Sequence, residues 1–230
     1  MTLAERTPPA AWRAGLGRRL GRVVVPSVYH CVVRGRDHVP AEGPLVLVAN
    51  HSGMLDGPLV MSLAPRAVTF LVKQEMFHGG VGSVLRGVGQ IPIDRTTGDR
   101  RALDAARAVL ARGGVVGVFP EGTRGAGDVQ QVNQGATWLA LQTGARVVPV
   151  CVLGTRVAGR SADALPRVRA RVVADFGQPF DLEVDPALPG RARLVSATDL
   201  LRERLAAHVA RATASDGARP VVDPPRPPPV

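Results

Sequence analysis

Residues 45–57, with the sequence LVLVANHSGMLDG, change character halfway along. Residues 45–49 form an apolar run typical of a strand, and the polar residues 50–53 end it. Asp56 follows His51 by five positions. If the chain curls back, the Asp56 carboxylate accepts the Nδ1 proton of His51 and leaves Nε2 free to act as a base. The same residues are ordinary turn formers, and by itself this short pattern fits a turn better than a catalytic pair.

A second polar stretch, FPEGTR at residues 119–124, directly follows an apolar run. Glu121 offers a carboxylate, Gly122 a flexible backbone amide and Thr123 a hydroxyl, and Arg124 stands behind them. A loop of this kind can hold a polar, phosphorylated molecule. Taken alone, it fits a surface turn equally well.

Two further stretches depart from a plain alternation of strands and helices. In GQIPIDR, residues 89–95, the apolar segment closes on Arg95, which fits a bidentate phosphate ligand or an arginine paired with Asp94. In VVPVCVLG, Pro149 lies inside an apolar strand. A proline there removes a ladder hydrogen bond, which indicates a sheet edge, a bulge or a pocket wall.

In their order and character, these four stretches resemble the sequence blocks of the glycerophospholipid acyltransferase family. Asn50, His51 and Asp56 match the family's N-H-x4-D block, and residues 89–95 match a block that ends in a basic residue. Residues 119–124 match F-P-E-G-T-R letter for letter, and residues 148–150 match a block centred on proline. The resemblance covers roughly residues 30 to 180, and four ordered blocks are far more specific than one.

The resemblance implies a role for each matched residue. His51 is the expected general base and Asp56 its orienting carboxylate, so that an acceptor hydroxyl attacks a thioester directly, without a covalent enzyme intermediate. The expected acceptor-binding residues are the cations and the polar loop, namely Lys73, Arg95, Glu121, Gly122, Thr123 and Arg124. No metal ion is expected at the site.

The activity that the resemblance implies is transfer of a fatty acyl group to the sn-2 hydroxyl of 1-acyl-glycerol-3-phosphate, which gives phosphatidate. The expected donor is acyl-CoA or acyl carrier protein as co-substrate, with no further cofactor. The same chemistry on glycerol-3-phosphate or another lysophospholipid remains an alternative. Two other classes remain open as well: a non-catalytic module that binds anionic lipids, and a hydrolase that uses His51 and water.

The elements that must position these residues alternate along the chain, which predicts an α/β fold: a single domain with a mixed, mostly parallel sheet flanked by helices. The apolar runs typical of buried strands are 44–49, 67–72, 115–119 and 147–152. Residues 168–176 alternate as a half-exposed edge strand does. The expected helices are 98–114, capped by Thr97 or Asp99, 135–145, and 196–213, with capping-box spacing at Ser196 and Asp199.

The domain prediction has three parts: a basic amphipathic N-terminal region at 1–29, an acyltransferase domain at 30–212 and a disordered, Pro-rich tail at 213–230. Within the first part, residues 11–25 combine apolar side chains with arginines. This pattern fits a helix lying on a membrane surface and, equally, a helix packed on its own domain. No run reaches the ~18 apolar residues that a membrane-spanning helix needs.

The composition limits the partners. The net charge is +10, which favours anionic partners such as phosphorylated substrates or an acidic membrane surface. Aromatic residues make up only 3%, which argues against a nucleic-acid surface built on stacking rings. Cys31 and Cys151 lie in apolar surroundings without metal-type spacing and are expected to be buried free thiols. The expected location is cytoplasmic, peripheral on the inner face of the cell membrane.

Overall fold

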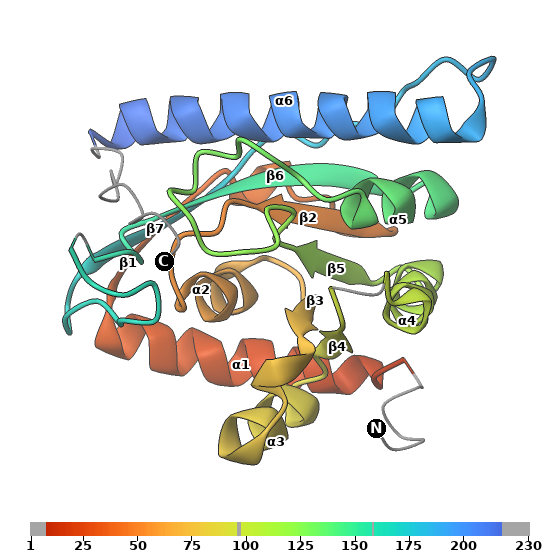
Figure 1. Ribbon diagram of the computed structural model, residues 1–230. Coiled ribbons are helices and arrows are strands. Elements are labelled where there is room, and N and C mark those ends of the chain that lie inside the picture. Colours follow the sequence, from red (N-terminus) through yellow and green to blue (C-terminus); the bar gives the residue numbers. More distant parts are fainter. Residues whose placement is uncertain (1–7, 96–97, 158, 218–230) are drawn as a thin grey trace, which may run out of the picture.

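In the computed structural model, which describes residues 8–95, 98–157 and 159–217, seven strands form one sheet in the order β1-β7-β6-β2-β5-β3-β4 (Figure 1). Every neighbouring pair is parallel except β6 and β7. The fold class predicted from the sequence is therefore confirmed. The strands are β1 (His30–Arg34), β2 (Leu45–Ala49), β3 (Val68–Lys73), β4 (Ile91–Ile93), β5 (Val115–Val118), β6 (Arg146–Leu153) and β7 (Arg171–Phe176).

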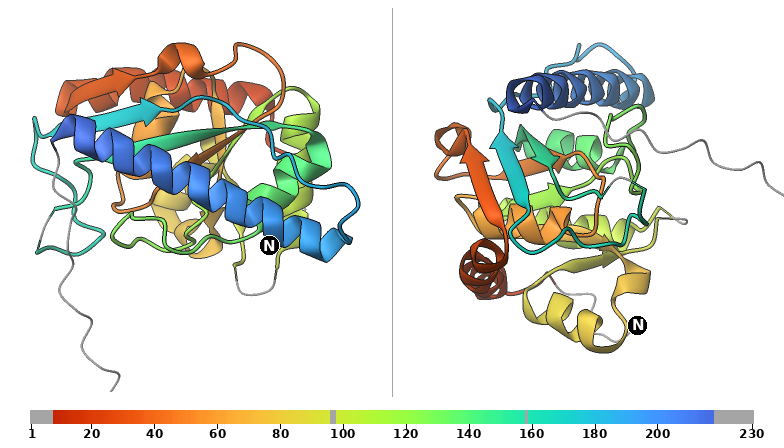
Figure 2. Two further views of the ribbon diagram at one scale, coloured as in Figure 1. Left: turned by 90° about the horizontal axis from the view of Figure 1, so that it is seen from above. Right: turned by 90° about the vertical axis from the view of Figure 1, so that its left-hand side faces the viewer.

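Helices cover both faces of this sheet (Figures 1 and 2). Helix α1 (Ala11–Val28) and helix α2 (Asp56–Leu63) lie on one face, with α3 (Gly79–Gly87) below them in Figure 1. Helices α4 (Arg100–Ala111), α5 (Gly135–Thr143) and α6 (Gly190–Asp216) lie on the other. Short 3-10 turns occur at Arg36–His38 and Gln74–Met76.

Strand β2 shows why the sheet needs both layers. All five of its residues are buried. Val46 and Val48 belong to the core under α4, α5 and α6, whereas Leu45, Leu47 and Ala49 belong to the core under α1 and α2. Alternate side chains of a strand point to opposite faces, so a continuous apolar run requires cover on both sides.

The parallel register brings the functional stretches to one edge of the sheet. Strand β2 lies between β5 and β6 and is parallel to both, with Leu47 opposite Gly117 on one side and Val148 on the other. Strands β3 and β4 extend the same parallel set beyond β5. The carboxyl ends of these five strands therefore meet, and each of the polar stretches follows one of them.

Two predictions about β6 and β7 have different outcomes. Residues 168–176 were expected to form an edge strand, and this is wrong: β7 lies between β1 and β6, and β1 forms the edge. The misleading alternation involves exposed arginines that mostly precede β7 rather than its buried centre. Pro149 lies opposite a bulge: Val147 and Val150 are three positions apart, whereas their partners Phe180 and Phe176 are four apart, so the extra residue is on the partner side.

The helix ends also differ in part from the predictions. Asp99 caps α4 through the N–H groups of Arg101 and Ala102. Helix α6 begins at Gly190, so Ser196 lies inside the helix and is not its cap; the residues just before Ser196 are mostly good helix formers. The helix continues to Asp216, whose carboxylate accepts hydrogen bonds from Arg34 and Arg171 and so fixes this end. The rest of the predicted Pro-rich tail lies outside the described residues.

Helix α1 packs on its own domain with one side and exposes apolar side chains on the other. A Cβ placed on Gly21 would lie 2.1 Å from Ser62 Oγ, so α1 approaches α2 closely. Trp12, Leu20 and Val23 are exposed by 64%, 55% and 72%. Within the parts of the chain that the structure describes, no helix combines the length and the hydropathy that crossing a bilayer requires.

Candidate functional site

Asn50 ends strand β2 and turns the chain toward the site. Its side chain is buried and pairs with the backbone of Val152 in the way that a neighbouring strand would. Nδ2 donates to the carbonyl of Val152 at 3.1 Å, and Oδ1 accepts from the Val152 N–H at 2.7 Å. The β2–β6 pairing is thereby extended by a side chain while the backbone is free to leave the sheet. His51 is the first residue after this point.

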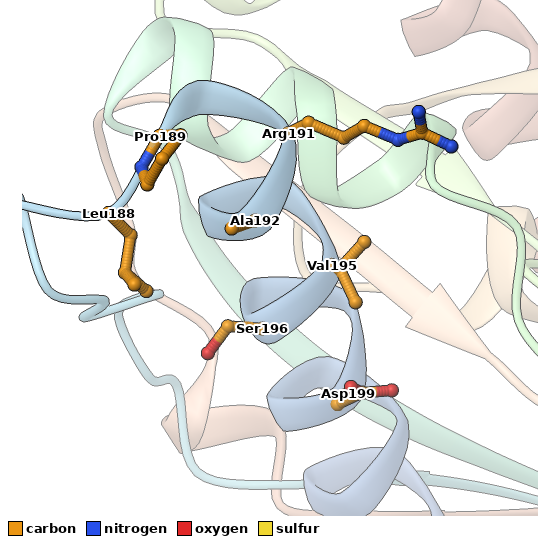
Figure 3. A pocket seen from close by; sticks show the side chains of 7 residues that line it. All are labelled: Leu188, Pro189, Arg191, Ala192, Val195, Ser196 and Asp199. Atoms are coloured by element: carbon orange, nitrogen blue, oxygen red, sulfur yellow. The ribbon is translucent and has the colours of Figure 1, made fainter.

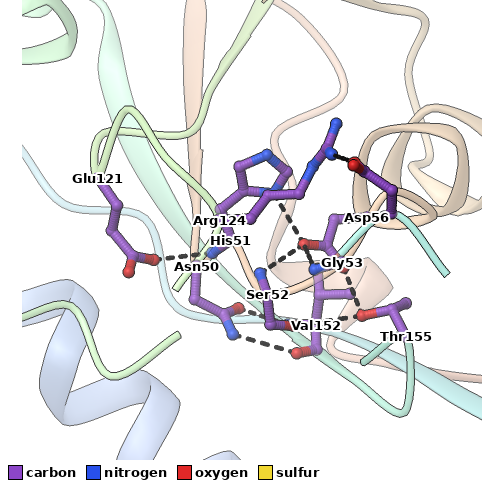
Figure 4. A network of polar contacts seen from close by, with 10 residues as sticks. Asn50, His51, Ser52, Gly53, Asp56, Glu121, Arg124, Val152 and Thr155 are labelled. Atoms are coloured by element: carbon purple, nitrogen blue, oxygen red, sulfur yellow. Dashed lines mark hydrogen bonds and ion pairs between the residues drawn. The ribbon is translucent and has the colours of Figure 1, made fainter. Parts of the chain in front are cut away.

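The structure brings His51 and Asp56 together (Figure 4). His51 Nδ1 lies 2.8 Å from Asp56 Oδ2. The same oxygen accepts the backbone N–H groups of Ser52 at 2.7 Å and Gly53 at 2.9 Å. A carboxylate oxygen that already accepts two amide protons must accept a third from Nδ1, so the ring proton sits on Nδ1 and Nε2 carries the lone pair.

An aromatic stack covers one face of the imidazole. The ring of Phe119 stacks on His51 with centroids 4.2 Å apart, and Phe70 stacks on Phe119 at 5.2 Å. The His51 side chain keeps 16% of its surface exposed, whereas that of Asp56 has none. The imidazole is therefore fixed on two sides and still reachable by a substrate.

Glu121 braces the backbone of His51. Its Oε1 accepts the His51 N–H at 2.7 Å, and the carbonyl of His51 accepts the N–H of Gly125 at 3.0 Å. Burial raises the pKa of Glu121 to about 7, and the charges of Asp128 and Asp56 act in the same direction, against the N–H of His51. Sequence reasoning placed Glu121 among the substrate-binding residues, and in the structure its carboxylate accepts the backbone N–H of His51.

The predicted cations lie around the same edge. Lys73 ends β3 opposite Ile93 of β4, two residues before Arg95. Arg95 is exposed, and its Nη1 lies 4.0 Å from the position that a Cβ on Gly122 would take. Gly122 has φ +73°, the left-handed conformation that the turn after β5 requires.

Arg124 differs from the other two cations because it has a partner. Its Nη1 forms an ion pair with Asp163 of the loop that follows β6. Thr123, next to it, is exposed. Of the three predicted cations, Lys73 and Arg95 have no hydrogen bond or ion pair to another described residue.

Sequence reasoning missed two members of the site. Thr155 is fully buried and its hydroxyl donates to Asp56 Oδ1. Phe119 was identified only as the first residue of the FPEGTR stretch, without a role of its own. In the structure its ring stacks on the imidazole of His51. Both contacts join distant parts of the chain. The position of Thr155 just after an apolar strand, as for His51, is the one signal in the sequence that points to it.

Other features of the described residues lie apart from this cluster. The described residues contain no group of three His, Cys, Asp or Glu side chains arranged for a metal ion. An open hollow of about 680 Å³ lies at the start of α6 (Figure 3). It is lined by residues such as Leu188, Arg191 and Asp199, and by none of the site residues.

The chain matches the model of the family described as Acyltransferase over residues 30–153, more than half of its length. It is 26% identical over 175 residues to the 1-acyl-sn-glycerol-3-phosphate acyltransferase of Bacillus subtilis, covering 75% of this chain and 85% of that protein. It is 36% identical over 123 residues to the alpha form of the human enzyme, covering 51% of this chain and 44% of that one.

A solved structure has the same fold. The crystal structure of the 1-acyl-sn-glycerophosphate acyltransferase PlsC from Thermotoga maritima superposes with a TM-score of 0.61 over 90% of this chain and 79% of that one, at 24% identity. The chain spans most of the length of the Bacillus subtilis and Thermotoga maritima proteins and less than half of the human one.

The raised pKa of Glu121 predicts a pH-dependent stability. In the folded chain Glu121 holds its proton up to about pH 7, whereas in the unfolded chain it releases it near its ordinary value of 4.5. Folding is therefore favoured at low pH and loses this contribution as the pH rises through 7. Between about pH 5 and pH 8, the melting temperature of the wild-type chain should fall relative to that of Glu121→Gln, which keeps an acceptor for the His51 N–H and does not titrate. Parallel curves for the two proteins would contradict the assignment.

Proposed function

Because the chain belongs to the acyltransferase family, we propose that it is an O-acyltransferase that moves a fatty acyl group from a thioester donor to the sn-2 hydroxyl of 1-acyl-glycerol-3-phosphate, giving phosphatidate. The observation that carries this proposal is the contact of His51 Nδ1 with Asp56 Oδ2 at 2.8 Å, which leaves Nε2 free at the edge where the cations gather. The choice of acceptor is supported by the relatives, which are 1-acyl-sn-glycerol-3-phosphate acyltransferases.

The proposed step begins with the acceptor hydroxyl on His51 Nε2. The ring takes the hydroxyl proton as the oxygen attacks the thioester carbonyl, and the tetrahedral intermediate then expels the donor thiolate, which recovers that proton from the ring. Asp56 holds the ring orientation and offsets the positive charge that the imidazolium carries in between. No side chain needs to form a covalent intermediate.

Lys73, Arg95 and Arg124 are the proposed ligands of the acceptor phosphate. Arg95 offers a planar guanidinium beside Gly122, and Lys73 lies on the neighbouring strand. Arg124 binds the phosphate after its ion pair with Asp163 is broken. Gly122 and Thr123 of the same loop are the proposed contacts of the glycerol-phosphate part, and Glu121 fixes that loop to His51.

Acyl-CoA or acyl carrier protein is the proposed donor, and no other cofactor is required by the step. Both carry the acyl group on a phosphopantetheine thiol, so either one suits the same base. The exchange leaves a free thiol, which makes the reaction directly measurable.

His51→Ala should lower acyl transfer to 1-acyl-glycerol-3-phosphate by about 10²–10⁴, because general-base catalysis contributes on that order. The assay follows thiol release from acyl-CoA with a panel of acceptors: 1-acyl-glycerol-3-phosphate, glycerol-3-phosphate and other lysophospholipids. The circular dichroism melt of the variant serves as the control for folding.

Each outcome of that panel decides between functions. Faster transfer to a different acceptor would replace the proposed substrate. Thiol release without any acceptor would indicate a hydrolase, and no release with any acceptor would indicate a module that only binds lipid. Full activity of a folded His51→Ala protein would remove His51 as the base.

Arg95→Gln should raise the KM for the phosphorylated acceptor by about 10-fold or more and leave the KM for acyl-CoA unchanged, since hydrogen bonds to charged groups are worth about 1.5–3 kcal/mol. Arg107→Gln is the matched control, because Arg107 lies on the exposed side of α4 and pairs with Asp104. A rise in both KM values, or in neither, would exclude Arg95 from the phosphate site.

We further propose that the chain works at the inner face of the cell membrane and docks there through the outer side of α1. Trp12, Leu16, Leu20 and Val23 follow helical spacing and are exposed, and Arg19 and Arg22 lie exposed among them. Apolar side chains flanked by arginines suit the boundary between acyl chains and anionic headgroups. The two free cysteines suit a reducing compartment.

The double variant Trp12→Ser/Leu20→Ser should bind anionic phospholipid vesicles at least tenfold more weakly than the wild type in a sedimentation assay, since burying each side chain contributes about 1.5–3 kcal/mol. Val195→Ser is the control, because Val195 is 44% exposed on α6, on the opposite face of the sheet (Figure 1). Equal binding of all three proteins would exclude α1 as the docking surface. Deleting α1 is not a suitable test, because the helix packs against α2.

A further inference from the structure

Among the described residues, the Thr155 side chain is the one hydroxyl that donates to the carboxylate of Asp56. It lies two residues after the end of β6, is fully buried, and donates to Asp56 Oδ1 (Figure 4). We propose that Thr155 is a positioning residue for the reaction: it fixes the rotation of the Asp56 carboxylate and so holds His51 in its catalytic orientation. This inference rests on the proposed function of His51 as the base.

The two carboxylate oxygens of Asp56 accept different numbers of hydrogen bonds. Oδ2 accepts three hydrogen bonds, from His51 Nδ1 and from the backbone N–H groups of Ser52 and Gly53. Oδ1 accepts from Thr155, and the structure records no second donor to it among the described residues. Without the threonine hydroxyl, a fully buried carboxylate oxygen loses its partner, which is strongly unfavourable.

The Thr155 hydroxyl is itself held in place. Ser52 Oγ lies 3.3 Å from Thr155 Oγ1. Because the Thr155 proton is directed at Asp56, the Ser52 hydroxyl is the donor of this pair. Ser52 therefore touches the carboxylate twice, once through its backbone N–H and once through Thr155, and a closed ring of hydrogen bonds results.

The backbone geometry keeps the two loops in contact. A Cβ on Gly53 would lie 2.6 Å from the carbonyl oxygen of Thr155, so only glycine permits this approach. The Met54 N–H also donates to the carbonyl of Ala162 in the loop after β6, at 3.1 Å. The loop after β6 is thus packed directly against the loop that carries His51.

This arrangement gives Thr155 a role in the chemical step rather than in substrate binding. When His51 takes a proton, the imidazolium needs Oδ2 in the ring plane at Nδ1. An Oδ1 without a donor lets the carboxylate rotate toward other N–H groups, which misaligns the base at the moment it is charged. Thr155 reaches the substrate only through Asp56 and His51, so its removal should affect kcat and spare both KM values.

The test compares three variants of the full chain in the thiol-release assay. Thr155→Val should lower kcat about tenfold or more with both KM values unchanged, and Thr155→Ser, which keeps the hydroxyl, should restore most of it. Thr137→Val is the control: Thr137 is fully buried on α5, and its hydroxyl has no hydrogen-bond partner among the described residues. It should retain wild-type kcat.

A double-variant cycle shows whether Thr155 acts through Asp56. In the Asp56→Asn background, Thr155→Val should cost less than about twofold further, because the group that it positions is already disabled. Additive losses, or an unchanged kcat in Thr155→Val alone, would overturn the inference. An inactive wild type would instead indicate that the proposed function is wrong. If Thr155→Val does not fold, Thr155→Ala and Ser52→Ala are measured in the same cycle, and an unchanged kcat in both likewise overturns it.

Discussion

The buried carboxylate of Asp56 is the interaction on which the rest of the site depends. Its side chain is inaccessible to solvent, and an ionised group in that position is tolerated only when its lone pairs are satisfied. Four donors from two loops meet this need, and they also dictate the turn at residues 51–53 and the approach of the loop after β6. Asp56 is also the first residue of α2, where the helix dipole favours a negative charge. One electrostatic requirement therefore fixes the helix start, the turn and the tautomer of His51.

The sheet topology decides which residues can meet that carboxylate. Because β2 lies between β5 and β6, its carboxyl end has one neighbour on each side. The β5 side supplies Phe119, which stacks on the imidazole, and Glu121, which holds the His51 N–H. The β6 side supplies the Val152 backbone for Asn50 and the hydroxyl of Thr155. The parallel register is thus the reason that blocks separated by about a hundred residues in the sequence form one site.

The sequence predicted those parts of this arrangement that have a local signature. Apolar runs located strands β2, β3, β5 and β6, and the turn residues after β2 and β5 indicated the polar loops. It misjudged β7, whose arginines suggested an edge, because strand order depends on contacts with β1 that no local pattern records. It missed Thr155 for the same reason: its partner Asp56 is 99 positions away, and a threonine after a strand is ordinary. Local propensity locates elements, and long-range packing selects the partners of each side chain.

The net charge of +10 is not carried by free cations alone, because several arginines have partners within the protein. Arg34 and Arg171 both donate hydrogen bonds to Asp216. The hydrogen bond from Arg171 holds the pKa of the Asp216 carboxyl below its ordinary value. Arg18 and Arg66 donate to backbone carbonyls. These four guanidiniums stabilise the fold, because they donate hydrogen bonds to acceptors of the protein. A phosphate would have to compete with those acceptors. Lys73 and Arg95 differ, because they lie near the sheet edge that carries His51 and have no hydrogen bond or ion pair to another described residue. For the proposed phosphate site, the pairing of each nearby cation therefore matters as well as the size of the basic excess.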